Sequence, residues 1–558
     1  MKLPNKIRIE MGKYVGKRCV IFIIAVIFLN FGGLAQRDTS KKQTIDIISS
    51  YKPVLGNFAK INLTPTPLKV DSNLPKLTYT IPALNLFFTY QPVTLKPLAL
   101  SMDSALPLGI RNYVKAGFGN YSTPLFQADL SFGDVSKKLL NVSGGYYSSR
   151  GKIEYQDVTL ANILGAGSYF SPKNELYGSA GFDFKQYYQY GFDHSLHIYP
   201  KDSVNKAYSD VSVGFGIRNL LANGSDGFMY NPNVDLHFYS AKNNVSETDL
   251  VFVLPVEKKL SEALSLSLIL NENSSSYKQT STLVNTKINN NLLTITPSAT
   301  YNTDRFNLKI GIQPTIDKDK VYILPQISGA IEIQPNLLLQ AGLVGNTIKN
   351  NFRSLSMLNP YMNFPSVLLS TKETEVYGGI RTKIRHHMDV FAKIGLKHYS
   401  NMPLFINDSL SGKGFYINYE PAINDINIHG EIRYYSQEKF AISGILDMNT
   451  YSGLRTNANA WELVPVKFTS DARWNVSKKA IVKGSLLIQS GIPVYQRNIA
   501  EKKLASGIDL STGAEYMVTN KLSAWLDLDN LLNNKYARWN NYKVYGLQVL
   551  AGIKYQFK

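Results

Sequence analysis

Residues 545–557, with the sequence YGLQVLAGIKYQF, decide the fold class of this chain. Every second position is apolar, and the positions between are polar or glycine, with Leu550 as the single exception. Successive side chains of a β-strand point to opposite faces, so this alternation predicts a strand with one apolar and one polar face. The apolar face comprises Tyr545, Leu547, Val549, Ala551, Ile553, Tyr555 and Phe557, and the polar face comprises Gly546, Gln548, Gly552, Lys554 and Gln556.

The same alternation recurs upstream, for example over residues 211–217, 264–270, 306–312 and 426–432. About 22 such segments lie between residues 111 and 557, which leaves ~20 residues for each strand and its connection, a spacing typical of antiparallel strands of membrane-barrel length. We therefore predict an all-β fold, in which residues 111–558 form a transmembrane antiparallel up-and-down β-barrel of about 22 strands.

A soluble alternative does not fit this strand number. About 22 strands in one soluble barrel would enclose an interior too wide to fill, since even 16–18-stranded barrels leave a channel. A propeller needs a sequence repeat of blade length, and we find none. If the apolar faces turn to lipid and the polar faces to an aqueous lumen, the difficulty disappears, and the sheet must then close on itself.

Aromatic side chains support the membrane interpretation, because Tyr and Trp favour the headgroup level of a bilayer. Strand propensity also favours these residue types, so the pattern is supporting information only. The aromatic residues that lie at or near expected strand ends are Tyr146, Tyr147, Tyr187, Tyr188, Tyr434, Tyr435, Trp461, Trp474 and Trp525.

The first 35 residues have the three parts of a secretory signal peptide. Six basic residues and one acidic residue precede an apolar stretch over residues 20–31, and small residues follow it. We expect cleavage between Ala35 and Gln36. As a membrane anchor, the apolar stretch would be short of the ~20 residues that a spanning helix needs. Removing the signal lowers the formal charge from +19 by five to +14 and takes away Cys19, the only cysteine, which excludes disulfides and cysteine catalysis.

Residues 36–110 form a distinct Pro-rich extension. Proline recurs every few residues, and because it lacks the backbone donor and fixes φ, neither a helix nor a central strand can continue through this spacing. We expect extended, polyproline-like segments that lie in the periplasm or inside the lumen. The prolines of this stretch are Pro53, Pro65, Pro67, Pro75, Pro82, Pro92, Pro97 and Pro107.

Residues 526–557 resemble the end of TonB-dependent receptors. That family has an Asn-Leu-hydrophobic-Asn/Asp-x-x-Tyr turn before a last strand that ends in Phe, and here Lys558 follows the Phe. The matching residues are Asn530, Leu531, Tyr536, Gly546, Tyr555 and Phe557. Residues 45–100 are similar to the start of receptor-type barrels from Bacteroidota.

The resemblance implies an outer-membrane barrel that is inserted by the barrel assembly machinery, contacts lipid and lipopolysaccharide, and takes up or binds a small solute. It also implies TonB or another periplasmic protein as a partner. The chain departs from the family in one respect. A receptor of this family has a globular plug ahead of the barrel, whereas the proline spacing of residues 36–110 cannot form one, and we find no TonB box.

Catalytic, cofactor and metal sites are not expected. The histidines are scattered, with His194 near His197 and His386 beside His387, whereas a metal site needs three or four converging ligands. No Gly-x-Ser-x-Gly elbow is present, so an outer-membrane hydrolase is the weakest alternative and we predict that the protein is not an enzyme. No nucleic-acid recognition motif accompanies the positive charge.

Five cations at polar-face positions make a candidate lumen wall that favours anionic solutes. The alternative is that they hydrate the lumen or contact lipopolysaccharide near the rim. These residues are Arg381, Lys383 and Arg385 on one expected strand, and Lys393 and Lys397 on the next.

The sequence thus predicts a barrel for solute or nutrient uptake. A non-transport scaffold, whose Pro-rich extension docks a periplasmic partner, is the second hypothesis.

Overall fold

The computed structural model describes residues 112–557, apart from residues 135–136, 221–227, 281–284, 386, 409, 437–438 and 497–498. The expected signal peptide with its cleavage site at Ala35 and Gln36, and the Pro-rich extension over residues 36–110, lie outside the described residues. In the part that is described, no helix is long and apolar enough to span a bilayer.

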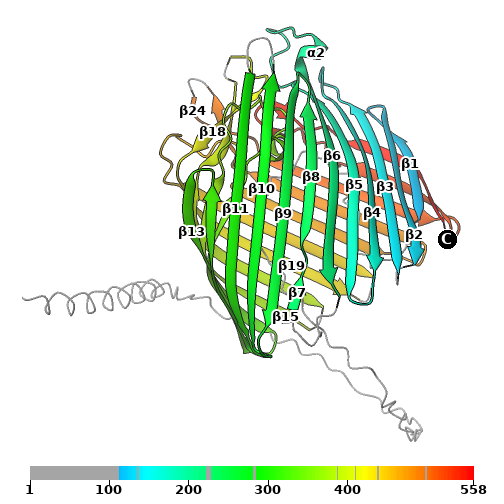
Figure 1. Ribbon diagram of the computed structural model, residues 1–558. Coiled ribbons are helices and arrows are strands. Elements are labelled where there is room, and N and C mark those ends of the chain that lie inside the picture. Colours follow the sequence, from blue (N-terminus) through cyan, green and yellow to red (C-terminus); the bar gives the residue numbers. More distant parts are fainter. Residues whose placement is uncertain are drawn as a thin grey trace, which may run out of the picture. The chain divides into compact units, whose positions relative to one another are not determined.

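One closed antiparallel sheet dominates the structure (Figure 1). It contains 23 strands, and because β7 and β8 are two parts of one strand on either side of Pro232, its wall has 22. The strands are β1 (Tyr113–Gly119), β2 (Thr123–Asp134), β3 (Lys138–Arg150), β4 (Asp157–Phe170), β5 (Asn174–Tyr188), β6 (Asn205–Asn219), β7 (Phe228–Tyr230), β8 (Asn233–Ala241), β9 (Val245–Lys259), β10 (Leu264–Thr280), β11 (Asn285–Asn302), β12 (Phe306–Asp317), β13 (Lys320–Gln334), β14 (Leu337–Ile348), β15 (Thr371–Ile384), β16 (Met388–Ser400), β19 (Ile423–Ser436), β20 (Phe440–Ser452), β21 (Val466–Asn475), β22 (Ala480–Ser490), β25 (Gly507–Met517), β26 (Leu522–Asp529) and β29 (Gln548–Gln556). The predicted fold class is confirmed.

Each strand pairs with the next strand along the chain, and the last strand, β29, pairs with the first, β1. Tyr113 lies opposite Gln556 and Gly119 opposite Leu550 in this closing pair. No edge of the sheet remains, which is the condition for placing a sheet in hydrocarbon.

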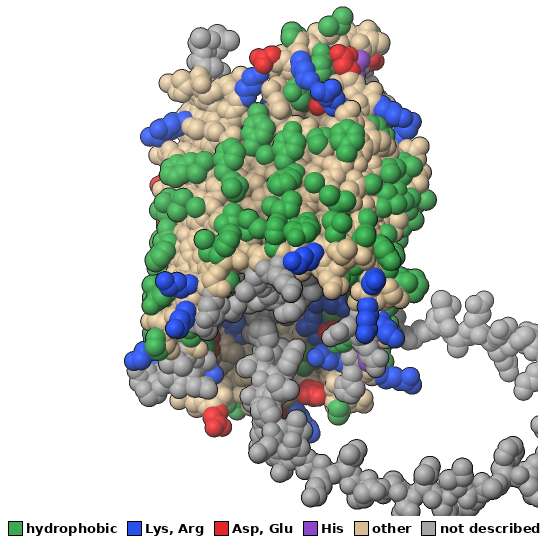
Figure 2. Space-filling model, turned by 90° about the vertical axis from the view of Figure 1, so that its right-hand side faces the viewer, with side chains coloured by type: hydrophobic (Ala, Val, Ile, Leu, Met, Phe, Trp, Pro, Cys, Tyr) green, Lys and Arg blue, Asp and Glu red, His purple; other side chains and the backbone are tan. Residues whose placement is uncertain are grey.

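The alternation seen in the sequence corresponds to the two faces of the wall. On β25, Ile508, Leu510 and Tyr516 are exposed, whereas Asp509 and Ser511 between them are buried. The stretches 211–217, 264–270, 306–312 and 426–432 follow the same rule, because their apolar residues are exposed on the outside. Examples are Val211, Val213, Phe215, Leu266, Leu268, Ile310, Ile312, Ile426, Ile428 and Ile432. Figure 2 shows the band of hydrophobic side chains that results.

The two ends of the barrel differ. The short-turn end carries both chain ends of the barrel and mostly tight connections. The long-loop end carries the connections 189–204, 349–370, 401–422, 453–465, 491–506 and 530–547. These connections contain the helices α2 (Lys201–Val204) and α3 (Phe352–Leu358) and the hairpins β17 (Met402–Asn407) with β18 (Phe415–Glu420), β23 (Pro493–Gln496) with β24 (Ile499–Lys503), and β27 (Ala537–Trp539) with β28 (Tyr542–Lys543).

The aromatic residues expected at strand ends divide into two groups. Tyr434, Tyr435 and Trp474 are exposed at the short-turn end, where a headgroup layer would lie. Tyr187, Tyr188, Trp461 and Trp525 are buried instead, whereas near the other end of β3 Tyr146 is exposed and Tyr147 is half-buried. Alternation separates wall residues by face, but it does not show which buried aromatic residues receive partners from loops.

The closing seam between β1 and β29 depends on glycine. A Cβ atom at Gly552 would lie 2.0 Å from the carbonyl oxygen of Ala116 and 2.7 Å from the ring of Trp525. The same ring stacks under the Lys115 ammonium, 3.8 Å from the ring centroid, and Lys115 pairs with Asp527 at 3.1 Å. Side chains from β1 and β26 therefore fill the space that the seam glycines leave free.

Replacing Gly552 by valine should prevent ring closure, because no rotamer moves a Cβ away from a backbone oxygen. We expect a loss of about 3 kcal/mol or more, the upper end for overpacking. The measurement is the fraction of refolded protein that resists SDS without heating. Gly378→Val is the matched control, since nothing lies within 4 Å of a Cβ atom there. Equal folded fractions for both variants would contradict this account.

Candidate functional site

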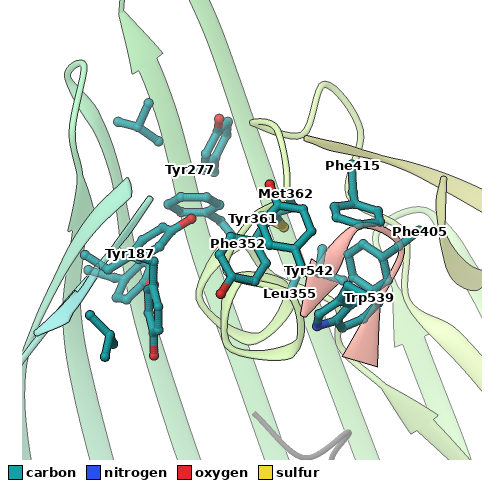
Figure 3. Packing of buried hydrophobic residues seen from close by; sticks show 14 of the residues in the cluster. Tyr187, Tyr277, Phe352, Leu355, Tyr361, Met362, Phe405, Phe415, Trp539 and Tyr542 are labelled. Carbon is teal, nitrogen blue, oxygen red and sulfur yellow. The ribbon is translucent and has the colours of Figure 1, made fainter. Parts of the chain in front are cut away.

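Loops from the long-loop end fold across the barrel interior and meet in one buried cluster, which we call the mouth cluster (Figure 3). The wall contributes Val158, Tyr187, Tyr208, Tyr239, Val245 and Tyr277, and the loops contribute Tyr190, Phe352, Leu355, Tyr361, Met362, Leu368, Phe405, Phe415, Trp539 and Tyr542. Aromatic rings meet mostly edge to face, as between Tyr239 and Phe352, whose centroids are 5.4 Å apart.

Tyr542 is the point where loops from distant parts of the wall meet. Its ring stacks on Tyr361 at 3.8 Å and contacts Tyr190 at 4.8 Å, and its hydroxyl donates to the carbonyl oxygen of Lys413. These partners belong to connections that follow β14, β5 and β16, whereas Tyr542 precedes β29. Strands that are so far apart in the ring can share a contact only if their loops enter the interior, so the loops cross the lumen at this end.

Helix α3 is held against the wall at its N-terminus. Asn351 caps the helix and accepts from the amide of Ser354 at 2.8 Å. The carboxylate of Glu247, on β9, accepts from the amides of Phe352 at 2.8 Å and Arg353 at 2.9 Å. Free amides at a helix start are suitable donors for a carboxylate, so one wall side chain fixes the first turn of α3.

A buried ion pair fixes the same loop at Lys349, two residues before the helix cap Asn351. Lys349 is 3% exposed and lies 3.2 Å from Asp249 on β9, which is 1% exposed. Lys349 also donates to Asn273 on β10. Arg353 adds weaker contacts, at 3.5 Å to Asp210 and 3.7 Å to Asp249. Burial lowers the pKa of Lys349, and the charge of Asp249 opposes that shift.

Wall tyrosines satisfy polar groups of the loop 349–370. Tyr208 donates to the carbonyl oxygen of Pro360 at 2.8 Å, and the hydroxyl groups of Tyr239 and Ser356 are 2.6 Å apart. Gln189 donates to the carbonyl oxygen of Tyr361 at 2.8 Å. A buried carbonyl group without a hydrogen-bond donor costs free energy. These hydrogen bonds therefore favour one docked position of the loop, in addition to the apolar contacts.

Two carboxylates link the remaining loops to one another. Glu420, at the end of β18, accepts from the amides of Arg455 at 2.7 Å and Asn457 at 2.9 Å. Burial alone would raise the pKa of Glu420, but hydrogen bonds from Asn457, Arg455 and Thr456 lower it to about 2. The connection 453–465 is therefore tied to the β17–β18 hairpin by an ionised carboxylate.

Glu462 is the second link. It is 2% exposed, and its carboxyl group accepts from the amide of Asn540 at 3.1 Å, next to the β27–β28 hairpin. Burial raises the pKa of Glu462 to about 8, although the nearby Arg538 lowers it in part. The other carboxyl oxygen is buried without a hydrogen-bond partner, which suits the protonated acid.

The residues that resemble the receptor C-terminus divide between a turn and a strand end. Asn530 has φ 49° and donates to the carbonyl oxygens of Asn534 and Tyr545. Leu531 is partly exposed, and its amide donates to the carbonyl oxygen of Leu510. Tyr536 donates to Asp509 at 3.2 Å. This segment is thus the structural turn that leads from β26 to the β27–β28 hairpin.

The other three signature residues lie at and after that hairpin. A Cβ atom at Gly546 would lie 2.3 Å from the side-chain oxygen of Asn533, so a larger residue there would have to displace the Asn533 side chain. Tyr555 and Phe557 are exposed on the outside of the short-turn end, with ring centroids 5.0 Å apart.

The candidate cationic wall lies on the expected faces of β15 and β16, but carboxylates alternate with it. Lys393 pairs with Glu375 at 2.6 Å, Lys397 with Glu373 at 3.5 Å and Arg381 with Asp389 at 3.6 Å. The carboxylates therefore neutralise these three cations locally. The cationic wall expected from the sequence took no account of these carboxylates. Lys383 and Arg385 are exposed at the short-turn end.

Histidine 429 on β19 was not singled out from the sequence. Its ring lies 2.7 Å from Asp447 and 3.2 Å from Glu431. Across the described ranges, no group of three or more His, Cys, Asp and Glu residues is placed to hold a metal ion.

Sequence reasoning also missed the mouth cluster. Its loop residues follow no period, so a search for alternation passes over them. The concentration of aromatic and apolar residues in connections 349–370, 401–422 and 530–547 was the available signal, because solvated loops are usually polar.

The barrel is similar to solved structures of iron transporters and siderophore receptors. The FrpB iron transporter from Neisseria meningitidis matches with a TM-score of 0.63 at 10% identity, over 81% of this chain and 82% of that chain. The siderophore receptor PirA from Acinetobacter baumannii matches with 0.62 at 8%, over 80% of each chain. FpvA from Pseudomonas aeruginosa, bound to a pyoverdine and iron, matches with 0.60 at 12%, over 80% of this chain and 71% of that chain.

Identities this low show a shared fold and no more. The resemblance to TonB-dependent receptors is confirmed as far as the barrel architecture. No model of a protein family matches the sequence. No curated protein matches it either.

Replacing Lys349 by alanine should release the loop 349–370, because Asp249 would stay buried without its nearest cation. Breaking a buried pair from one side costs roughly 3–5 kcal/mol. We expect rapid protease cleavage within this loop while the wall resists. The double variant Lys349→Met/Asp249→Leu should restore resistance, since it removes both charges. An unchanged cleavage rate in Lys349→Ala, measured beside the exposed-site control Lys383→Ala, would exclude the ion pair as the anchor.

The anchoring of the β27–β28 hairpin by Glu462 should weaken as pH rises. Its pKa in the folded state, about 8, is above the ordinary value of 4.5, so its contribution is complete below pH 4.5 and is lost as pH rises to about 8. We expect hydrogen exchange in residues 537–543 to accelerate over this window relative to Glu462→Gln at the same pH. A constant ratio between the two proteins would contradict the assignment.

Proposed function

We propose that the chain is a bacterial outer-membrane barrel that takes up or binds a small solute, with its long-loop end outside. Membrane barrels of this kind have short periplasmic turns and longer extracellular loops, and the two ends of this barrel differ in the same way. The signal peptide expected over residues 1–35, with cleavage between Ala35 and Gln36, supports export.

The observation that carries the proposal is a 22-strand wall whose inward face is polar and charged. An anchor needs only an apolar outside, and a barrel of 8 strands meets that need with a filled interior. The wider barrel encloses a lumen lined by pairs such as Lys393 with Glu375 and Lys554 with Glu515. Such a lining suits passage of a polar solute better than a passive support.

The similar structures agree with this function, since they include an iron transporter and a siderophore receptor. Iron-loaded chelates are therefore the first solutes to test. Because Lys393 and Lys397 are paired with carboxylates, we do not expect them to select strongly for anions. Lys383 and Arg385, at the short-turn end, remain able to attract anionic solutes.

In this proposal the mouth cluster acts as the gate for solute uptake. With the loops docked, chain segments cross the lumen at the long-loop end, so a solute enters only if some of them move. The Pro-rich extension 36–110 would then act at or in the opposite part of the lumen, in place of a plug, and TonB or another periplasmic protein would engage it.

The same closed mouth is the one observation that favours the second candidate, a non-transport scaffold. Loops fixed by buried ion pairs suit a barrel that only holds the extension 36–110 for a periplasmic partner. Only the uptake function predicts that the barrel conducts once the mouth is opened.

We predict that the mature chain conducts little in planar bilayers, because the docked loops cross the lumen and, on this proposal, the extension 36–110 occludes it as well. Lys349→Ala should raise conductance by undocking the loop 349–370, and deletion of residues 36–110 in the same background should raise it further. Lys535→Ala, at an exposed position of the connection 530–547, is the control for loss of one cation.

If deletion of residues 36–110 leaves the conductance unchanged in both backgrounds, the extension does not occlude the lumen. If all forms stay closed while loop proteolysis reports an open mouth, the uptake function fails. A partner that co-purifies with the mature chain and is lost on deletion would then establish the scaffold.

A further inference from the structure

Lysine and arginine residues follow one another around the short-turn end, in the turns and at the adjoining strand ends. We call this set the basic ring, and all of its members are exposed. It consists of Lys137, Lys138, Lys173, Lys258, Lys259, Arg305, Arg385, Lys439, Lys478, Lys479 and Lys521. Eight of the ten connections at this end contribute to it, so the charge surrounds the barrel rather than marking one side.

The basic ring has few carboxylates near it. In the described parts of these connections, Glu262 and Asp304 are the exposed acids, and no described side chain forms an ion pair with a ring member. The sequence of the same turns and strand ends adds Asp134, Glu175, Asp226, Glu332, Asp389 and Glu438, so cations still outnumber acids. Inside the barrel, by contrast, Lys115, Lys393 and Lys554 each have a carboxylate partner.

An aromatic girdle adjoins the basic ring on the outside of the wall. Its residues are exposed and lie beside the short-turn ends of their strands. They are Phe132, Tyr169, Tyr301, Tyr434, Trp474, Tyr516, Tyr555 and Phe557. Tyr and Trp in such a position mark the headgroup level of a bilayer, with hydrocarbon on one side and water on the other.

Figure 2 shows Lys and Arg side chains along the lower edge of the hydrophobic band, on the side of the short turns. Cations that directly follow a girdle are at the depth of lipid phosphates. Trp474 is followed by Lys478 and Lys479, Tyr301 by Arg305, and Tyr169 by Lys173. A long lysine stem also reaches along the apolar surface while its ammonium stays in water.

We propose that the basic ring and the aromatic girdle together form a docking surface for anionic glycerophospholipids in the leaflet that the short turns meet. The ammonium and guanidinium groups bind the headgroup phosphates, and the girdle and apolar band contact the first carbons of the acyl chains. An acidic protein would also meet the charge, but it would not cover the adjoining apolar wall, and this continuity favours lipid. The inference needs the barrel to lie in a bilayer, and it does not need the barrel to conduct.

The test compares two variants with the same net charge, using the full mature chain. The ring variant carries Lys→Gln at Lys137, Lys138, Lys258, Lys259, Lys478 and Lys479. The control variant carries Lys→Gln at six exposed lysines of the long-loop end, namely Lys152, Lys278, Lys287, Lys320, Lys503 and Lys535. Each protein is placed in nanodiscs of phosphatidylethanolamine with a minority of phosphatidylglycerol, so that both ends meet the same lipids.

Native mass spectrometry then counts the phosphatidylglycerol molecules that stay bound after extraction. We expect the wild-type and control proteins to be enriched in phosphatidylglycerol over the bulk mixture. The ring variant should retain at least about threefold less, because each cation near an anionic surface contributes to the attraction. The difference should shrink at high salt, where exposed charges are screened.

Two further proteins separate lipid binding from folding. Changing the same six residues from Lys to Arg keeps the charge and should keep the enrichment. Heat-modifiable migration on gels reports whether each protein is folded, and Lys478→Gln/Lys479→Gln replaces the ring variant if the latter does not fold. The proposal is overturned if wild-type protein shows no enrichment, or if the control variant loses as much phosphatidylglycerol as the folded ring variant.

Discussion

The pairing of β1 with β29 is the contact on which the rest of the structure depends. Each of the other wall strands already has two neighbours through its place in the chain, and only this pair removes the last free edge. In hydrocarbon an unpaired strand edge costs several kcal/mol for each polar group, so the sheet must either close or not insert. Gly552 and Trp525 serve this one requirement, because the first lets the two backbones approach and the second fills the space beside them.

Closure creates an interior, and the interior then decides which polar residues need partners. Glu247 and Asp249 face it from β9 and find theirs in the loop 349–370 rather than in water. The loops are consequently held by a few specific bonds around an aromatic centre, and not by burial alone. A closure that is held in this way should be released at single residues, whereas a purely apolar cap would loosen gradually.

The arrangement of charged residues differs between the lumen and the short-turn end of the barrel. Lumen cations such as Lys393 and Lys397 are paired with carboxylates on neighbouring strands, whereas the described members of the basic ring form no ion pair. An unpaired cation is costly in a confined space and costs little in water beside lipid phosphate. The positive net charge is therefore a poor guide to which solutes the lumen favours.

The sequence by itself determined the fold class, the approximate strand number and the face on which residues such as Ile426, Gln548 and Ile553 lie. These properties depend on local alternation, which one strand specifies without knowledge of the others. It also placed Arg381, Lys393 and Lys397 on inward faces, but not beside Asp389, Glu375 and Glu373, because pairing across strands depends on register. Only the tertiary structure decided that Tyr361, Tyr190 and Tyr542 meet, since loops without a period are positioned by the closed wall and not by their own sequence.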